Sequence, residues 1–188
     1  GVRKVDGFGP RRFASTARAE QYRLPFPAKH FAHQLWKRYV SSYTHEDLKR
    51  RAFERAAWVL QHHWEEQKDL LPRAARVHSR IFDTLIHSRH LIYGTSVKGT
   101  GHTEHLVPCA LIRDQAFNMF WEGKDVGAVA LMLQRTLKIA HITKEEARLL
   151  DVDLGLKTTM PGEWCFETGE VTARLDKAMI KLTLVDPG

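Results

Sequence analysis

Apolar residues recur at helical spacing over much of the chain, and this pattern predicts a mostly helical protein. Residues 28–40 carry one such stripe. A longer stripe follows Thr44, where Thr44 and Asp47 approximate a capping box, and it predicts a helix that ends at about Lys68. We expect the buried side of this helix to consist of Leu48, Ala52, Phe53, Ala56, Leu60 and Trp64.

The helical pattern returns several times further along the chain. Pro72 can occupy the first turn of a third helix, and Cys109–Trp121 and residues 125–138 continue the same periodicity. Thr143 opens a short helix with Glu146 as its capping-box partner. The buried positions of the third helix are expected to be Ala75, Val77, Ile81, Leu85 and Ile86.

The period changes near the middle of the chain. Residues 90–98 are rich in β-branched and aromatic side chains, residues 98–101 have turn chemistry, and residues 102–107 can return as a second strand. A further strand is expected at 164–166 and a short helix at 171–179. The pattern therefore predicts an α+β fold, mostly helical, with a central β-hairpin followed by helices and a small mixed C-terminal lobe.

Glycine and proline punctuate residues 1–27, which predicts a basic, irregular arm there. We expect residues 28–188 to form a single globular domain, with a helical half at 28–88 and a half made of the hairpin and mixed structure at 89–188. Apolar residues make up 43% of the chain and charged residues 27%, which is ordinary for a globular protein and argues against disorder of the whole chain.

The cysteine content and the hydropathy of the chain indicate in which cellular compartment the protein is expected. The chain has two cysteines, so the sequence implies no disulfide framework. Its longest apolar runs are far too short to cross a bilayer, and an apolar leader is not visible at its start. These features predict a cytoplasmic protein without a membrane partner.

Positive charge is concentrated in the first third of the chain. Residues 1–55 contain 13 Lys and Arg against five acids, whereas the whole chain has a net charge of +7. Such a distribution suits a polyanion, and we expect nucleic acid, with DNA preferred, as the partner. The alternative is a solvated basic surface. The candidate contacts to nucleic acid are Arg11, Arg12, Lys49, Arg50, Arg51, Arg55, Arg89 and Lys98.

One segment, residues 99–109, gathers two histidines, a carboxylate and a thiol. Within it, Glu104-His105-Leu106-Val107-Pro108 resembles the Asp/Glu-His-Ile/Val-Val-Pro signature of the HNH nucleases, the ββα-metal superfamily. The resemblance covers roughly a dozen residues. In that family the acidic residue binds a divalent metal at a hairpin, and the histidine deprotonates the water that attacks the phosphodiester.

By this resemblance Glu104 is a metal ligand and His105 the general base, and His102 is a second ligand or a phosphate contact. The family places a third Asn or His on a helix after a second strand. Here the helical pattern resumes at Cys109, so the third ligand stays open among Asn118, Asp125 and His141.

The chemistry is coherent with these residue types. Mg²⁺ or Mn²⁺ prefers carboxylate oxygen and stabilises negative charge on phosphorus, and an imidazole titrates near neutral pH. The resulting hypothesis is a divalent-metal-dependent hydrolase of nucleic-acid phosphodiesters.

Three other interpretations remain open. His102, His105, Cys109 and Cys165 could hold a structural Zn²⁺ ion. The protein could bind nucleic acid without catalysis, or dock its basic arm on an acidic protein partner. In the last two cases Glu104 and His105 are ordinary polar residues of a strand.

Two further groups of residues are weaker candidates for a site. Arg80, His87, Arg89 and His90 precede the hairpin and are candidates to face phosphate, or to cap a helix C-terminus. Lys157 and Arg174 flank a proline-glycine turn and are candidates to line a cleft.

Overall fold

The computed structural model describes residues 43–185. Residues 44–188 group into one compact unit. The predicted arm at 1–27, its boundary with the domain, and the helix predicted at 28–40 lie outside the described residues.

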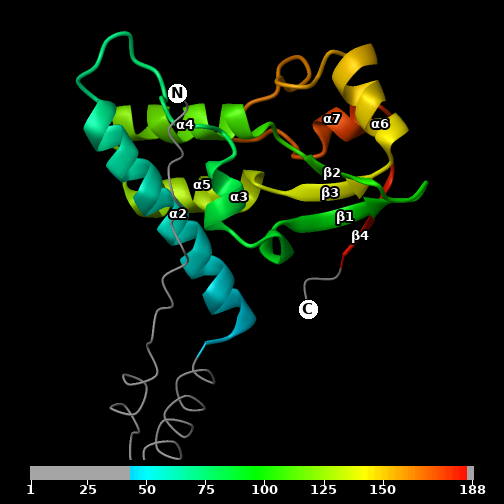
Figure 1. Ribbon diagram of the computed structural model, residues 1–188, viewed down its shortest axis with the longest axis horizontal. Coiled ribbons are helices and arrows are strands. Elements are labelled where there is room, and N and C mark those ends of the chain that lie inside the picture. Colours follow the sequence, from blue (N-terminus) through cyan, green and yellow to red (C-terminus); the bar gives the residue numbers. More distant parts are fainter. Residues whose placement is uncertain (1–42, 186–188) are drawn as a thin grey trace, which may run out of the picture. The chain divides into compact units, whose positions relative to one another are not determined.

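Three helices gather at one end of this unit: α2 (His45–Gln67), α4 (Cys109–Trp121) and α5 (Val126–Thr136) (Figure 1). The capping box predicted for α2 is confirmed, because Thr44 Oγ1 accepts from the Asp47 amide at 3.1 Å and Asp47 Oδ2 accepts from the Thr44 amide at 3.0 Å. The predicted bounds of α4 are confirmed as well, and α5 lies within the predicted range.

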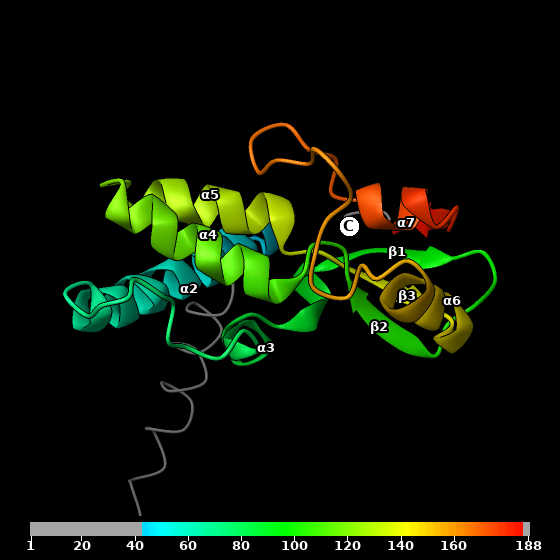
Figure 2. The same ribbon diagram turned by 90° about the horizontal axis from the view of Figure 1, so that it is seen from above.

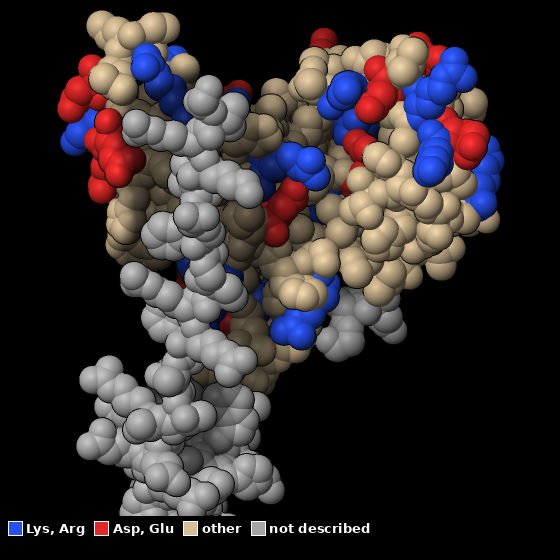
Figure 3. Space-filling model, viewed as in Figure 1, with Lys and Arg blue, Asp and Glu red and all other residues tan. Residues whose placement is uncertain are grey.

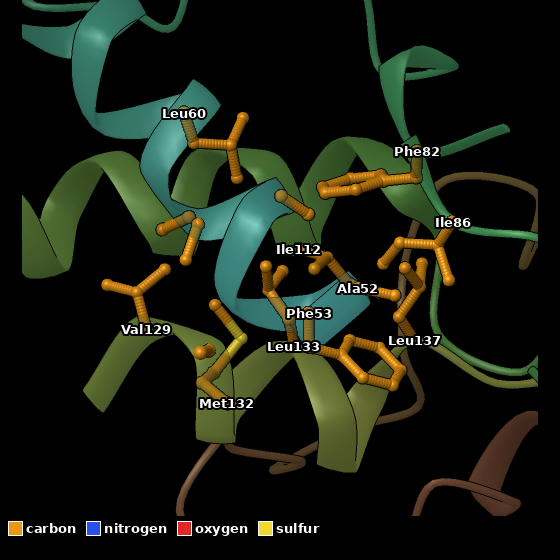
Figure 4. Packing of buried hydrophobic residues seen from close by; sticks show 14 of the residues in the cluster. Ala52, Phe53, Leu60, Phe82, Ile86, Ile112, Val129, Met132, Leu133 and Leu137 are labelled. Atoms are coloured by element: carbon orange, nitrogen blue, oxygen red, sulfur yellow. The ribbon is translucent and has the colours of Figure 1, made fainter. Parts of the chain in front are cut away.

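The main hydrophobic core lies between these helices. Figure 4 shows the labelled side chains of α2 and α5 turned toward one another, with Phe82 and Ile86 close by. Ala52, Phe53, Ala56 and Leu60 of the predicted α2 stripe are buried. Trp64 is partly buried against the same core, and Leu48 is 41% exposed because it stands in the first turn, beyond the end of the core.

A four-stranded mixed sheet adjoins the helices. Its strands are β1 (Ile92–Ser96), β2 (His102–His105), β3 (Ile139–Ile142) and β4 (Leu182–Leu184), in the order β2-β3-β1-β4. β1 and β3 are parallel, and the other two pairs are antiparallel. A Cβ atom at Gly94 would lie 2.8 Å from the Thr183 carbonyl oxygen, so only glycine permits this close approach of β1 and β4.

The predicted hairpin is wrong, although both of its strands exist. β3 lies between β1 and β2 and pairs with each of them. β1 and β2 are therefore not neighbours in the sheet, although only a short turn joins them in the sequence. β3 occupies the position between β1 and β2 because its side chains contribute to both hydrophobic clusters. Ile139 is buried in the cluster with the helices, and Ile142 is buried in the cluster on the other face of the sheet. A two-stranded hairpin without β3 would not connect these two clusters. The pattern of apolar residues did not predict β3 or β4.

A second hydrophobic cluster lies between the sheet and three short helical segments. These are α6 (Lys144–Arg148), the π-helical η2 (Leu149–Asp153) and α7 (Ala173–Lys177), which Figures 1 and 2 show beside the strands. The capping box predicted for α6 is confirmed. Its buried Glu146 also accepts a hydrogen bond from Ser96 Oγ at 2.8 Å, which ties α6 to β1.

Two more predictions fail locally. Instead of a full helix after Pro72, the chain forms only α3 (Ile81–Leu85) and the single 3₁₀ turn η1 (Ser88–His90). The irregular stretch before α3 is held by tertiary contacts, since Arg113 Nη1 donates to the Val77 carbonyl at 2.9 Å. Residues 164–166 do not form a strand: 164 and 165 are irregular, and a turn begins at 166.

The predicted fold class is nevertheless confirmed. Helix accounts for 49% of the described residues and strand for 11%, which makes the fold α+β and mostly helical. Among residues 43–185, no helix combines the length and the hydropathy that a membrane span requires.

Candidate functional site

The residues of the predicted site lie on β2, which is an edge strand. Its register with β3 pairs Glu104 with Ala140 and His105 with Ile139. Because successive side chains of a strand point to opposite faces, Glu104 faces the α6 and α7 side of the sheet and His105 faces the opposite side. The two adjacent residues therefore have different surroundings.

Glu104 is bound on both of its carboxylate oxygens. Oε1 accepts from Arg174 Nη1 at 2.8 Å, and Oε2 lies 3.1 Å from His102 Nε2. Arg174 Nη1 also donates to the His105 carbonyl at 2.8 Å, and Nη2 lies 3.7 Å from Asp151 Oδ1. This network joins β2, η2 and α7.

His105 is largely enclosed and lies near one carboxylate. Its Nε2 is 4.0 Å from Asp83 Oδ1 of α3, and it is buried with no hydrogen-bond partner within residues 43–185. Burial lowers the pKa of His105 below its usual value of 6.5, and Arg80 and Arg174 act in the same direction against Asp83 and Glu104. The imidazole is therefore neutral at pH 7.

A pocket of about 730 Å³ runs along this edge of the sheet. Both Glu104 and His105 line it, because an open strand edge can be reached from both faces of the sheet. The polar residues around it carry three cationic and three acidic groups, so the pocket is close to electrically balanced. The charged and imidazole-bearing lining residues are Arg80, Asp83, His87, Glu104, His105, Asp151, Lys157 and Arg174.

The placement of Lys157 and Arg174 in this lining agrees with their predicted position at a cleft, and Arg80 and His87 lie there too. The sequence pattern does not indicate that Arg174 is the partner of Glu104. The available signal was weak, since an arginine on an amphipathic helix is usually at the surface, whereas this one is 1% exposed.

The proposed metal ligands are not brought together. Asn118 is exposed on α4, Asp125 caps α5 by accepting from the Ala128 amide at 2.7 Å, and His141 Nδ1 lies 3.3 Å from Thr103 Oγ1. In the part of the chain that the structure describes, no group of three or more His, Cys, Asp or Glu side chains could hold a metal ion. In this arrangement Glu104 does not fit as a ligand, because its oxygens are occupied by Arg174 and His102.

The four residues considered for zinc do not form a metal-binding group within the described part of the chain. His102 and His105 point to opposite faces of β2. Cys109 begins α4, and burial raises the pKa of its thiol to about 12. Cys165 lies in a turn, where its Sγ is 3.0 Å from Thr168 Oγ1 and this hydrogen bond lowers its pKa.

The predicted contacts to nucleic acid lie only partly within the described residues. Arg11 and Arg12 lie outside the described residues. Several of the others already have partners: Lys49 Nζ is 3.3 Å from Glu46, Arg50 Nη1 is 2.6 Å from Glu54, Arg55 donates to the Leu85 carbonyl, and Arg89 Nε is 3.4 Å from His90 Nε2. Arg51 on α2 and Lys98 after β1 lie at the exposed surface, as do Arg50, Arg55 and Arg89.

The described surface has no strong excess of positive charge. Residues 43–185 contain 20 Lys and Arg against 19 acids, whereas residues 1–42 contain nine against two. Figure 3 accordingly shows basic and acidic side chains side by side on one face of the molecule. The net charge of the chain therefore resides mainly in its first 42 residues.

Comparison with known proteins does not assign the chain to a protein family. No protein-family model matches the sequence, and neither a curated protein nor a solved structure matches it. The residues that line the pocket are therefore the evidence for the function.

Proposed function

We propose that the protein hydrolyses phosphodiester bonds in nucleic acid, with His105 as the general base. The observation that carries this proposal is the state of His105. It lines a pocket, its Nε2 lacks a hydrogen-bond partner within residues 43–185, and burial lowers its pKa. A neutral imidazole with a free nitrogen is suited to take a proton from water.

The neighbouring groups support the same chemistry. When the imidazole gains a proton, Asp83 at 4.0 Å stabilises the new positive charge. Arg80 is paired with Asp83 at 3.1 Å and Arg174 with Glu104 at 2.8 Å, so Lys157 is the cation of the pocket lining that supplies positive charge for the phosphate oxygens. The basic first third of the chain supplies attraction for a polyanion.

The resemblance to HNH nucleases adds a divalent cation, Mg²⁺ or Mn²⁺, at Glu104. To bind one, Glu104 would have to release Arg174 or His102. We therefore assign no step of the reaction to a metal, and the assay treats the metal requirement as a variable.

The test is cleavage of plasmid DNA and of RNA, with Mg²⁺, with Mn²⁺ and with chelator. His105→Ala is expected to lower the rate by about 100-fold or more in whichever condition is active, as is usual for a lost general base. His62→Ala, an exposed histidine of α2, is the matched control and should cleave as the wild type does. Equal rates for wild type and His105→Ala would disprove the proposal.

A second candidate is a nucleic-acid-binding module without catalysis. It is favoured by the pairing of both Glu104 oxygens inside the fold, which is typical of a structural carboxylate. In this case binding depends on salt, survives chelator, and is retained by the Glu104→Gln variant, while no cleavage is seen under any metal condition.

A further inference from the structure

The guanidinium of Arg174 is buried but only partly bonded. It is 1% exposed, and Nη1 makes two hydrogen bonds, to Glu104 Oε1 and to the His105 carbonyl. Nε and Nη2 are also closed to solvent, and neither has a hydrogen-bond partner in residues 43–185. Buried polar groups are normally paired, so these two donors call for an explanation.

The two unpaired donors form one edge of the side chain. By the covalent geometry of arginine, Nη2 lies on the same side as the Nε–H group, and the two N–H bonds run parallel. This edge matches the spacing of two oxygens on one phosphate or carboxylate group. The opposite edge, which carries Nη1, is the one held by β2.

One carboxylate of the pocket lies close to this edge without bonding to it. Asp151 Oδ1 is 3.7 Å from Arg174 Nη2, beyond hydrogen-bond distance. Asp151 is on η2, it is partly exposed, and it lines the same pocket as Lys157 and Arg174. Its negative charge competes with any anion that would approach the free edge of the guanidinium.

We infer that the Nε and Nη2 edge of Arg174 is the binding site for two oxygens of a phosphate group, and that Asp151 is the carboxylate that this phosphate displaces. Lys157 lines the same pocket and adds a second positive charge. This inference rests on the proposed function for the choice of phosphate, because a nucleic-acid substrate brings phosphodiester oxygens to the pocket. Arg174 is thus a binding residue, held in place by Glu104.

Inorganic phosphate is the probe for this site, with binding followed by ³¹P line broadening and by the shift in melting temperature at constant ionic strength. Wild type is expected to bind weakly. Asp151→Asn removes the competing charge and should bind phosphate about tenfold more tightly, as expected for a charge within a few ångströms. Asp153→Asn, which is on the same helical turn and is exposed, is the control and should behave as the wild type does.

Arg174→Lys in the Asp151→Asn background keeps the charge but not the paired donors, and it should lose the added affinity. If this double variant does not fold, the comparison of Asp151→Asn with Asp153→Asn still decides. Equal phosphate binding by these two single variants would overturn the inference and leave Arg174 as a structural tie. Acetate binding as tight as phosphate binding to Asp151→Asn would overturn the choice of phosphate.

The outcomes separate this inference from the proposed function. If the phosphate experiment succeeds while His105→Ala cleaves as well as wild type, the catalytic proposal fails and the phosphate site stands. If phosphate does not bind but cleavage depends on His105, the reverse holds.

Discussion

Glu104 and His105 are adjacent on β2, but their side chains lie on opposite faces of the sheet and have different partners. Glu104 meets a buried guanidinium and a histidine, so both of its oxygens are engaged. His105 lies 4.0 Å from the Asp83 carboxylate, burial nevertheless lowers its pKa, and its Nε2 is unpaired within the described part of the chain. The sequence identified both residues but could not separate these roles, because the partners Arg174 and Asp83 come from distant parts of the chain.

The lowered pKa of His105 predicts a pH dependence of stability. In the unfolded chain the imidazole takes up a proton near its usual pKa of 6.5, whereas in the folded chain it does so only at lower pH. Between these two values the unfolded state binds more protons, so the free energy of unfolding decreases as the pH falls below about 6.5, by at most about 1.4 kcal/mol per pH unit for one proton.

His105→Gln should reduce this loss, as measured by urea unfolding at pH 7.5 and at pH 5.5. His62→Gln, at an exposed position on α2, serves as the control and should keep the wild-type difference between the two pH values. A wild-type pH dependence in His105→Gln would show that His105 is not the group responsible.

At the scale of elements, local signals predicted the helices better than the sheet. The capping boxes at Thr44 and Thr143 and the start of α4 after Pro108 are encoded within a few residues, and all are confirmed. β3 and β4 have only four and three residues, and their pairing partners are far away in the sequence. Such short strands have little recognisable pattern of their own, and the sequence does not show which strands pair. The local pattern therefore favoured direct pairing of β1 with β2, which is wrong.

Glu146 provides a test of how α6 is attached to the sheet. Its carboxylate accepts from the Thr143 amide at 3.0 Å and from Ser96 Oγ at 2.8 Å, and the residue is buried. Glu146→Ala removes the carboxylate half of the capping box and leaves a buried hydroxyl without its acceptor, so we expect a loss of about 2–3 kcal/mol in the free energy of unfolding.

Glu145→Ala is the matched control, because Glu145 is the preceding residue on α6 and is exposed. Chemical denaturation should show a change within about 0.5 kcal/mol for this variant. Equal effects of the two substitutions would contradict the structural role of Glu146.

At the scale of the whole molecule, charge and pocket are carried by different parts of the chain. Residues 43–185 are nearly neutral in sum, and their basic side chains often have acidic neighbours, as with Arg50 and Glu54. Residues 1–42 carry the excess. We therefore expect affinity for a polyanion to depend mainly on the first segment, and chemistry to depend on the pocket.

The salt dependence of DNA binding measures this division. Arg11→Gln together with Arg12→Gln should lower the steepness of log K against log salt by about 1.8 if both side chains contact phosphates. Arg50→Gln, at a residue already paired with Glu54 at 2.6 Å, should change the slope much less. A larger effect from Arg50 than from the arginine pair would place the polyanion on α2 instead.

The insertion of β3 between β1 and β2 has a consequence for synthesis of the chain. When β1 and β2 have left the ribosome, the strand that joins them is still missing, since it follows α4 and α5. Both strands then expose unsatisfied backbone groups, which are sites for association with other chains. Shortened proteins that stop before Ile139 should therefore aggregate, and they should lack the wall of the pocket that Arg174 supplies from 70 residues beyond Glu104.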